Sequence, residues 1–237
     1  MTDFGVRAVV EWKQIAFRLV ETRVTATTSS LRVETSPKHV RVMLDGRFVV
    51  DSHAPLLVWE KPYYPTYFFP LGEVDSSVID SRRTYARSEP GLDGYVALRW
   101  NEFDHWFEED QEVFVHARDP YKRIDILPSS RHVVVEVDGV VVAESTRPTM
   151  LFETSLLRRT YLPLTDVRMD LLVPSATRTQ CPYKGEAKYW SVLIGTTLHR
   201  DLVWSYPTPV WEAGPIAGLT CFYDERVDMT VDGIQQA

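Results

Sequence analysis

Residues 181–185, with the sequence CPYKG, are the sharpest candidate for chemistry in this chain. Proline and glycine favour a tight turn, so the sequence predicts that Tyr183 and Lys184 project from a constrained loop. A lysine held there could bind an anion as a point charge or, if desolvated, act as a base or an imine-forming amine. The alternative is a surface turn whose tyrosine packs on the following strand. Cys181 is a weaker candidate for a nucleophile, because a buried and inert cysteine is the commoner outcome.

A second group of polar candidates lies earlier in the chain. Glu153 closes the apolar run 150–152, where a carboxylate is costly unless it is partnered or solvated. Arg159 and Tyr161 follow it closely. A carboxylate and a guanidinium in this position could orient a polar ligand, or Glu153 could be an architectural hydrogen-bond centre.

Aromatic residues gather in the same part of the sequence, at Trp190, Trp204, Tyr206 and Trp211. Aromatic side chains at this density either build the core of a small domain or form the walls of a pocket for a flat ligand. The predicted ligand site therefore comprises Glu153, Arg159, Tyr161, Tyr183, Lys184, Trp190, Trp204 and Tyr206.

Several well-known motifs are absent from the sequence. It has no GxxxxGK[ST] phosphate loop, no GxGxxG, no GxSxG elbow and no HExxH zinc pair. Cys181 and Cys221 lie far apart with no CxxC between them, which argues against a structural zinc site unless histidines complete it. No metal and no cofactor are predicted.

Composition narrows the possible partners. The chain has 237 residues and a formal net charge of −7, whereas a general nucleic-acid binder is expected to be basic. No apolar run reaches the roughly 18 residues that a membrane helix needs, and no signal peptide is recognisable. Two cysteines cannot form a disulfide framework, which fits a reducing compartment. We therefore expect a cytoplasmic protein with a small-molecule ligand, without nucleic-acid or membrane partners, and of undetermined oligomeric state.

An internal repeat organises the chain. The segment that begins at Ser36, SPKHVRVMLDGRFVV, returns at Ser129 as SSRHVVVEVDGVVVA, an offset of 93 residues. Further on, LDGYVAL at residues 92–98 resembles IAGLTCF at residues 216–222, an offset of 124. The second copy therefore carries about thirty additional residues, which include CPYKG. The first copy has Thr66 and Phe68 where the second has Arg159 and Tyr161. This difference is expected if the first copy does not bind a ligand, and chance divergence explains it equally well.

The repeat also predicts the fold class. Each copy contains apolar alternation on both sides of an Asp-Gly pair, which is a hairpin signal, and short apolar runs with turn residues between them. We expect a mainly β protein of two tandem antiparallel β domains, residues 31–128 (reduced) and 129–237 (complete), with short accessory helices. Residues 1–30 form an extension in which apolar residues at helical spacing predict a helix.

Two further interpretations come from the first copy. The segment 101–112, NEFDHWFEEDQE, places its aromatic residues on one helical turn and predicts a solvated acidic face. His39 and His132 occupy equivalent positions before a strand, and a feature repeated in both copies is interpreted as structural.

The second copy resembles the domain of unknown function 427 family in tandem form. The resemblance rests on SSRHVVVEVDGVVVAES, LFETSLLRRTYLP, CPYKGEAKYWS, WSYPTP and PIAGLTCFYDERVD, which cover nearly all of residues 129–233. It implies a compact fold of the β-tent kind, and it places Glu153, Tyr161, Tyr183, Lys184, Trp190, Trp204 and Tyr206 at motif positions, with Arg159 inside the same motif.

Three functions compete on this basis. The first is binding of a small polar or anionic ligand in the second domain, with any catalysis open. The second is a non-catalytic protein-interaction module. The third is the nucleotidyltransferase activity with which the family is sometimes labelled, which would need a divalent ion near Asp224 and Asp228. The chain lacks a glycine-rich phosphate cradle, and its aspartate pairs fit turns and caps better.

Overall fold

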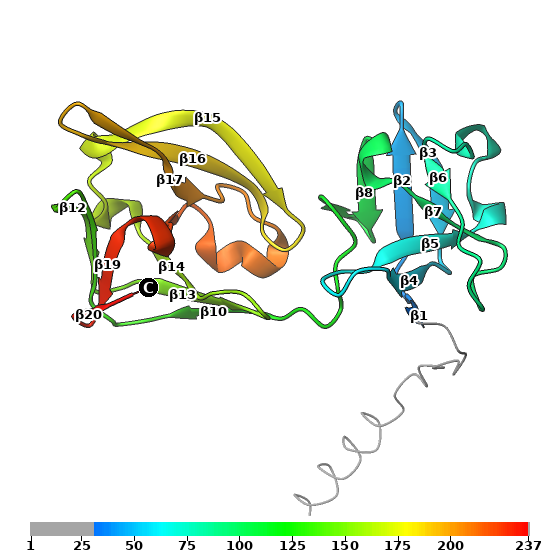
Figure 1. Cartoon of the computed structure of the whole chain (residues 1–237), viewed down its shortest axis with the longest axis horizontal. Coiled ribbons are helices and arrows are strands. Elements are labelled where there is room, and N and C mark those ends of the chain that lie inside the picture. The colour runs from blue at the N-terminus through cyan, green and yellow to red at the C-terminus, as the bar shows by residue number, and fades with distance from the viewer. Residues whose placement is uncertain (1–30, 237) are drawn as a thin grey trace, which may run out of the picture.

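A computed structural model describes residues 31–236, so the helix predicted within residues 1–30 lies outside the described residues. Throughout the described part, β-strands form four sheets in which all paired strands are antiparallel (Figure 1). This confirms the mainly β fold that the repeat predicts.

The first repeat unit contains two sheets. One has the order β1-β4-β5-β7-β6, and the other has the order β3-β2-β8-β9. Their strands are β1 (Arg32–Thr35), β2 (Val40–Leu44), β3 (Arg47–Ser52), β4 (Leu56–Trp59), β5 (Thr66–Pro70), β6 (Thr84–Tyr85), β7 (Tyr95–Leu98), β8 (His105–Glu108) and β9 (Gln111–Val113), with 3-10 turns η1 (Leu71–Glu73), η2 (Ser76–Val78) and η3 (Trp100–Glu102).

The second repeat unit is built on the same plan with a larger main sheet. Its seven-stranded sheet has the order β10-β13-β14-β18-β17-β16-β15, and its four-stranded sheet has the order β12-β11-β19-β20. The elements are β10 (Ile124–Pro128), β11 (Val133–Val137), β12 (Val140–Ser145), β13 (Thr149–Glu153), β14 (Arg159–Leu162), η4 (Leu164–Asp166), η5 (Met169–Leu171), β15 (Leu172–Cys181), β16 (Gly185–Ile194), β17 (Thr197–Ser205), η6 (Trp211–Ile216), β18 (Thr220–Phe222), η7 (Asp224–Arg226), β19 (Asp228–Val231) and β20 (Ile234–Gln235).

The Asp-Gly pairs make the hairpins that the sequence predicts. Asp45 and Gly46 join β2 to β3 with φ values of 51° and 73°, and Asp138 and Gly139 join β11 to β12 with 50° and 72°. Positive φ at both central residues defines the turn that matches the twist of the flanking strands. The turn chemistry therefore holds the register of both hairpins.

The additional residues of the second unit are the hairpin β15–β16 and most of β17. These three strands are 10, 10 and 9 residues long, and they extend the main sheet beyond β18 (Figure 1). At the other edge, β10 pairs with β13 in the same way as β1 pairs with β4. Residues 124–128, which the sequence assigns to the first domain, thus lie in a sheet of the second unit.

Each main sheet has two apolar faces. In the second unit, Leu162, Val203 and Phe222 face the four-stranded sheet and form the core between the two sheets. Their neighbours along the strands, among them Tyr161 and Trp204, point to the opposite face, where η6 and the adjoining loop cover them in part. This second face carries the candidate site.

The helical interpretation of residues 101–112 is wrong. Only 100–102 form a 3-10 turn, and β8 and β9 follow as a hairpin. Trp106 and Glu108 alternate with exposed or half-buried residues, so both side chains point inward. Glu108 is 2% exposed rather than solvated, because Lys38, Arg118 and the Tyr67 hydroxyl surround its carboxylate.

Candidate functional site

Four residues from four neighbouring strands form a transverse row on the second face of the main sheet. Tyr161 on β14 lies opposite Cys221 on β18, Cys221 lies opposite Trp204 on β17, and Trp204 lies opposite Tyr189 on β16. Directly opposed residues of antiparallel strands point to the same face of the sheet. The row therefore makes a continuous floor of three aromatic rings and a thiol, in which the Trp204 indole N–H points to the Tyr161 hydroxyl at 3.3 Å.

An arginine closes one edge of this floor. Arg159 precedes Tyr161 by two residues on β14, so it shares the same face. Its guanidinium donates two hydrogen bonds to Glu225, at 2.7 and 2.8 Å, and lies 5.6 Å from the ring centre of Trp204 and 5.9 Å from that of Tyr223. The bidentate pair fixes the plane of the guanidinium and lowers the pKa of Glu225.

A lysine and a carboxylate close another edge. Lys184 forms an ion pair with Glu153, and both side chains are largely buried, at 13% and 5% exposed. The turn that carries Lys184 is held from behind by the segment that follows β17, because the amide of Val210 donates to the Lys184 carbonyl at 3.2 Å. Gly185 ends the turn at φ +97°, and a Cβ atom there would lie 3.4 Å from the backbone of Thr208. The CPYKG sequence thus makes the constrained turn that it predicts.

These elements enclose a pocket of about 360 Å³, which we call the aromatic pocket. Six of the eight residues in the predicted ligand site line it: Glu153, Arg159, Tyr161, Lys184, Trp204 and Tyr206. Tyr189, Tyr223, Leu151, Leu156 and Leu157 complete the lining. The structure therefore brings together six predicted residues that are as much as 53 positions apart (153 to 206) around one cavity.

The ionisable groups of the aromatic pocket are mostly held neutral or paired. Burial raises the pKa of Tyr161 and of Tyr206, so both phenols stay protonated. Burial also raises the pKa of the Cys221 thiol, which leaves it without the thiolate that a nucleophile needs. Burial is the main cause of the raised pKa of Asp224, whose carboxylate lies 3.4 Å from Arg159. The site can stack a ring and exchange hydrogen bonds, and it presents no activated nucleophile among these groups.

Two predicted site residues lie elsewhere. Trp190 is opposite Val203 on β17 and packs on the core between the sheets. Tyr183 leaves the CPYKG turn on the side of the first unit, where its hydroxyl accepts a hydrogen bond from the Asp119 amide at 2.8 Å. Its ring meets His116 edge-on at 6.3 Å, and it lines a separate hollow of about 290 Å³.

Sequence reasoning missed Tyr189 and Tyr223. Strand alternation allows only one of Tyr189 and Trp190 to share a face with Trp204, and pairing with β17 selects Tyr189. The signal in the sequence is the alternation of apolar residues in β16 and β17, because matching the two patterns would have given the register of the hairpin. For Tyr223, the signal is its spacing of two residues from Cys221, because Tyr223 continues the extended backbone by one residue beyond β18.

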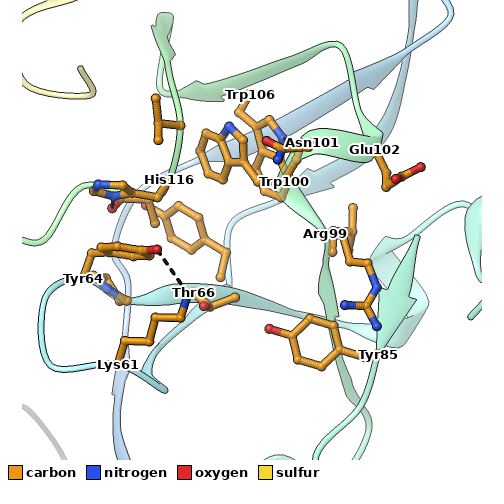
Figure 2. A pocket seen from close by; sticks show the side chains of 15 residues that line it. Lys61, Tyr64, Thr66, Tyr85, Arg99, Trp100, Asn101, Glu102, Trp106 and His116 are labelled. Atoms are coloured by element: carbon orange, nitrogen blue, oxygen red, sulfur yellow. Dashed lines mark hydrogen bonds between the residues drawn. The ribbon is translucent and has the colours of Figure 1, made fainter. Parts of the chain in front are cut away.

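The first unit has a pocket of its own, of about 410 Å³. Figure 2 shows Tyr64 lying flat against His116 and Trp100 against Trp106, with ring centres 3.9 and 4.2 Å apart. The first unit therefore has a cavity even though Thr66 and Phe68 occupy the positions that correspond to Arg159 and Tyr161.

A cation on an aromatic ring also recurs in the first unit. Arg99 lies 5.0 Å from the ring centre of Tyr85 (Figure 2). Arg99 directly follows β7, and by strand register its position corresponds to that of Tyr223 in the second unit. The cation that lies against an aromatic ring therefore comes from the residue after β7 in the first unit and from β14 in the second. Glu60, the counterpart of Glu153, pairs with Arg87. Both units thus contain a carboxylate–cation pair at this position. This recurrence supports a structural role for Glu153 in addition to any role in ligand binding.

The sequence has two pairs of closely spaced aspartates, 166 with 170 and 224 with 228, and three of these four carboxylates have cationic partners. Asp166 accepts hydrogen bonds from Arg147, and Asp170 pairs with Arg168. Within residues 31–236, neither these two nor Asp224 belongs to a cluster of three metal-ligating side chains.

Comparison with known proteins identifies the family of this chain. The family model described as a domain of unknown function (DUF427) matches residues 32–90 and 125–233, which confirms the resemblance and its two-part character. No curated protein matches the chain. Among residues 31–236, no helix has the length and apolar character that crossing a membrane requires.

Proposed function

The chain belongs to the DUF427 family, and from the aromatic pocket we propose that it binds a small molecule with a planar ring and with polar groups at the edges of that ring. The observation that carries this proposal is the row Tyr161–Trp204–Tyr189 with ion pairs at its edges. Apolar and aromatic walls with a few convergent polar groups are the usual chemistry of small-molecule sites.

The charges of the pocket narrow the class of ligand. Lys184 faces Glu153, and Arg159 faces Glu225 and Asp224. A simple anion would have to displace a carboxylate from one of these cations, whereas a ligand with both donors and acceptors can bridge the existing pairs. A neutral or zwitterionic ligand therefore suits the site better than a phosphate.

The burial of the rings favours a pocket over a protein-interaction patch. Tyr161, Tyr189, Trp204 and Tyr206 are all buried, whereas an interaction surface presents its aromatic residues to solvent. Leu156 and Leu157, at 58% and 61% exposed, form the rim at which a ligand would enter. We propose binding without assigning a reaction, in the cytoplasm, where Cys181 and Cys221 would remain the free thiols they are here.

The proposal is tested on the full chain by a thermal-shift screen of neutral and zwitterionic metabolites that contain a planar ring, with nucleotides and sugar phosphates as the anionic comparison set. A ligand at about 100 times its dissociation constant adds roughly 2.7 kcal/mol to the free energy of unfolding, which gives a readily visible shift. The pocket variant is Leu157→Trp, which places an indole at the rim without removing a buried contact. The matched control is Leu164→Trp, at an exposed leucine (40%) that does not line the pocket.

A ligand whose shift disappears in Leu157→Trp and persists in Leu164→Trp supports binding in the aromatic pocket. Arg159→Gln then reports whether the ligand needs the guanidinium. The proposal fails if no compound stabilises the protein, or if every stabilising compound acts equally on both tryptophan variants. Failure would move the search to a protein partner.

A further inference from the structure

The open end of the first β-hairpin gathers three side chains that can bind a metal. Val40 pairs with Ser52 and Arg41 with Asp51 across β2 and β3, so His39 and His53 are the next opposed positions. Val40 and Ser52 point into the core. By alternation, His39, Asp51 and His53 lie together on the outer face of the hairpin.

The three side chains already converge. The His39 and His53 rings stack with centres 4.0 Å apart and 16° between their planes, and His39 Nε2 lies 2.6 Å from Asp51 Oδ1. One ligand atom from each residue lies within 4.8 Å of the others. Tetrahedral zinc with Zn–N bonds of about 2.0–2.1 Å needs its ligand atoms roughly 3.3 Å apart. Rotation of the exposed Asp51 and His53 side chains towards the half-buried His39 can close that difference on a fixed backbone.

The backbone beneath them is well anchored. The His39 amide donates to the Glu109 carboxylate at 2.9 Å, and the Glu109 amide donates to the His39 carbonyl at 2.8 Å. Arg41 is the nearby cation, and its guanidinium is turned away to Asp110 and the Glu109 carbonyl. Asp51 is therefore left facing the imidazoles.

We propose that His39, Asp51 and His53 form a binding site for a divalent transition-metal ion of the zinc class. Two imidazoles and one carboxylate match the donor preferences of Zn²⁺ and leave a coordination position for water. The site lies on the four-stranded sheet of the first unit and shares no residue with the aromatic pocket.

The second unit contains a natural comparison. His132 and Glu144 occupy the positions of His39 and Asp51, and they form the same pair at 2.8 Å. Thr146 stands where the first unit has His53. The repeat thus retains two of the three ligands, and the third ligand distinguishes the two hairpins.

Calorimetric titration of zinc chloride into the full chain, after treatment with a chelator, tests the site. The key variant is His53→Thr, which reproduces the second unit's residue at an exposed position. Changes in residues around a metal site alone cost about 10- to 100-fold in affinity, so removal of a ligand should weaken binding by about 100-fold or more. The converse variant, Thr146→His, should bind a second ion.

Nuclear magnetic resonance of the imidazole nitrogens identifies the ligands directly. We expect zinc to shift the signals of His39 and His53, while those of His132 shift only in Thr146→His. Circular dichroism of each metal-free variant checks that the fold is unchanged. The proposal is overturned if zinc binds the wild type more weakly than about 1 mM, if His53→Thr binds it as tightly as the wild type, or if Thr146→His gains no second ion.

Discussion

The Glu153–Lys184 pair provides the sharpest test of the pocket's energetics. Lys184→Met removes the cation and keeps the length of the side chain, so Glu153 is left 5% exposed without its partner. Breaking a buried pair from one side costs about 3–5 kcal/mol, because the remaining charge cannot regain its hydration. We expect about 3 kcal/mol, since Lys184 itself is 13% exposed and the site is not wholly dry.

The reverse variant should cost less. In Glu153→Leu, the long Lys184 side chain can carry its ammonium towards solvent, so we expect a loss of about 1–2 kcal/mol. The double variant removes both charges and should lie within about 1 kcal/mol of the wild type, because replacing a buried ion pair by apolar residues is often neutral. The coupling energy of the cycle, which is the sum of the two single losses minus the loss of the double variant, is then about 3–5 kcal/mol.

Urea unfolding of the full chain, followed by circular dichroism and tryptophan fluorescence, measures these differences. Two transitions are fitted separately if the two units unfold independently. Additive effects in the double variant, or a Lys184→Met loss below about 1 kcal/mol, would refute the description of a buried and mutually dependent pair. The same reasoning excludes Lys184 variants as clean probes of ligand binding, because their stability changes without any ligand.

Three further predictions concern single positions. Gly185→Ala should destabilise the protein by more than about 1 kcal/mol in urea unfolding, because its φ of +97° is strained for alanine and the new Cβ meets backbone; Gly195→Ala, with φ +58° and open space, is the control and should cost less. Asp75 has a pKa of about 2, chiefly through hydrogen bonds from Ser77. Its contribution to stability is therefore present above the unfolded-state pKa of about 3.9 and is lost as the pH falls towards 2, so Asp75→Asn should flatten the acid side of the stability curve in that window. The buried thiol of Cys221 should resist alkylation until the protein unfolds, and mass spectrometry showing its rapid labelling in the folded state would contradict the burial.

Much of the fold follows from local patterns. The Asp-Gly turns, the alternation of β11 and the repeat itself are encoded within short segments, and each predicts the same architecture. The CPYKG turn belongs to the same class, since proline and glycine restrict the backbone wherever the segment lies. Glu153, Arg159 and Lys184 could also be identified as candidates from the sequence, because ionisable groups beside apolar runs need a partner or solvent.

The segment 101–112 shows where local patterns fail. Its sequence suits an acidic helix as well as a hairpin, and burial of Glu108 depends on Lys38 and Arg118. These residues are 70 and 10 positions away, so no short window contains the cause. Once the strand forms, the carboxylate must point inward, and the two cations compensate for its desolvation.

The sequence by itself determined the strands, the turns and the set of residues with chemical potential. Tertiary structure decided which of them meet. Pairing of β16 with β17 places Tyr189 in the aromatic pocket and Trp190 in the core, and the direction of the CPYKG turn separates Lys184 from Tyr183. The physical reason is that side chains alternate along a strand, so a shift of one residue in a long-range register exchanges the two faces of the sheet.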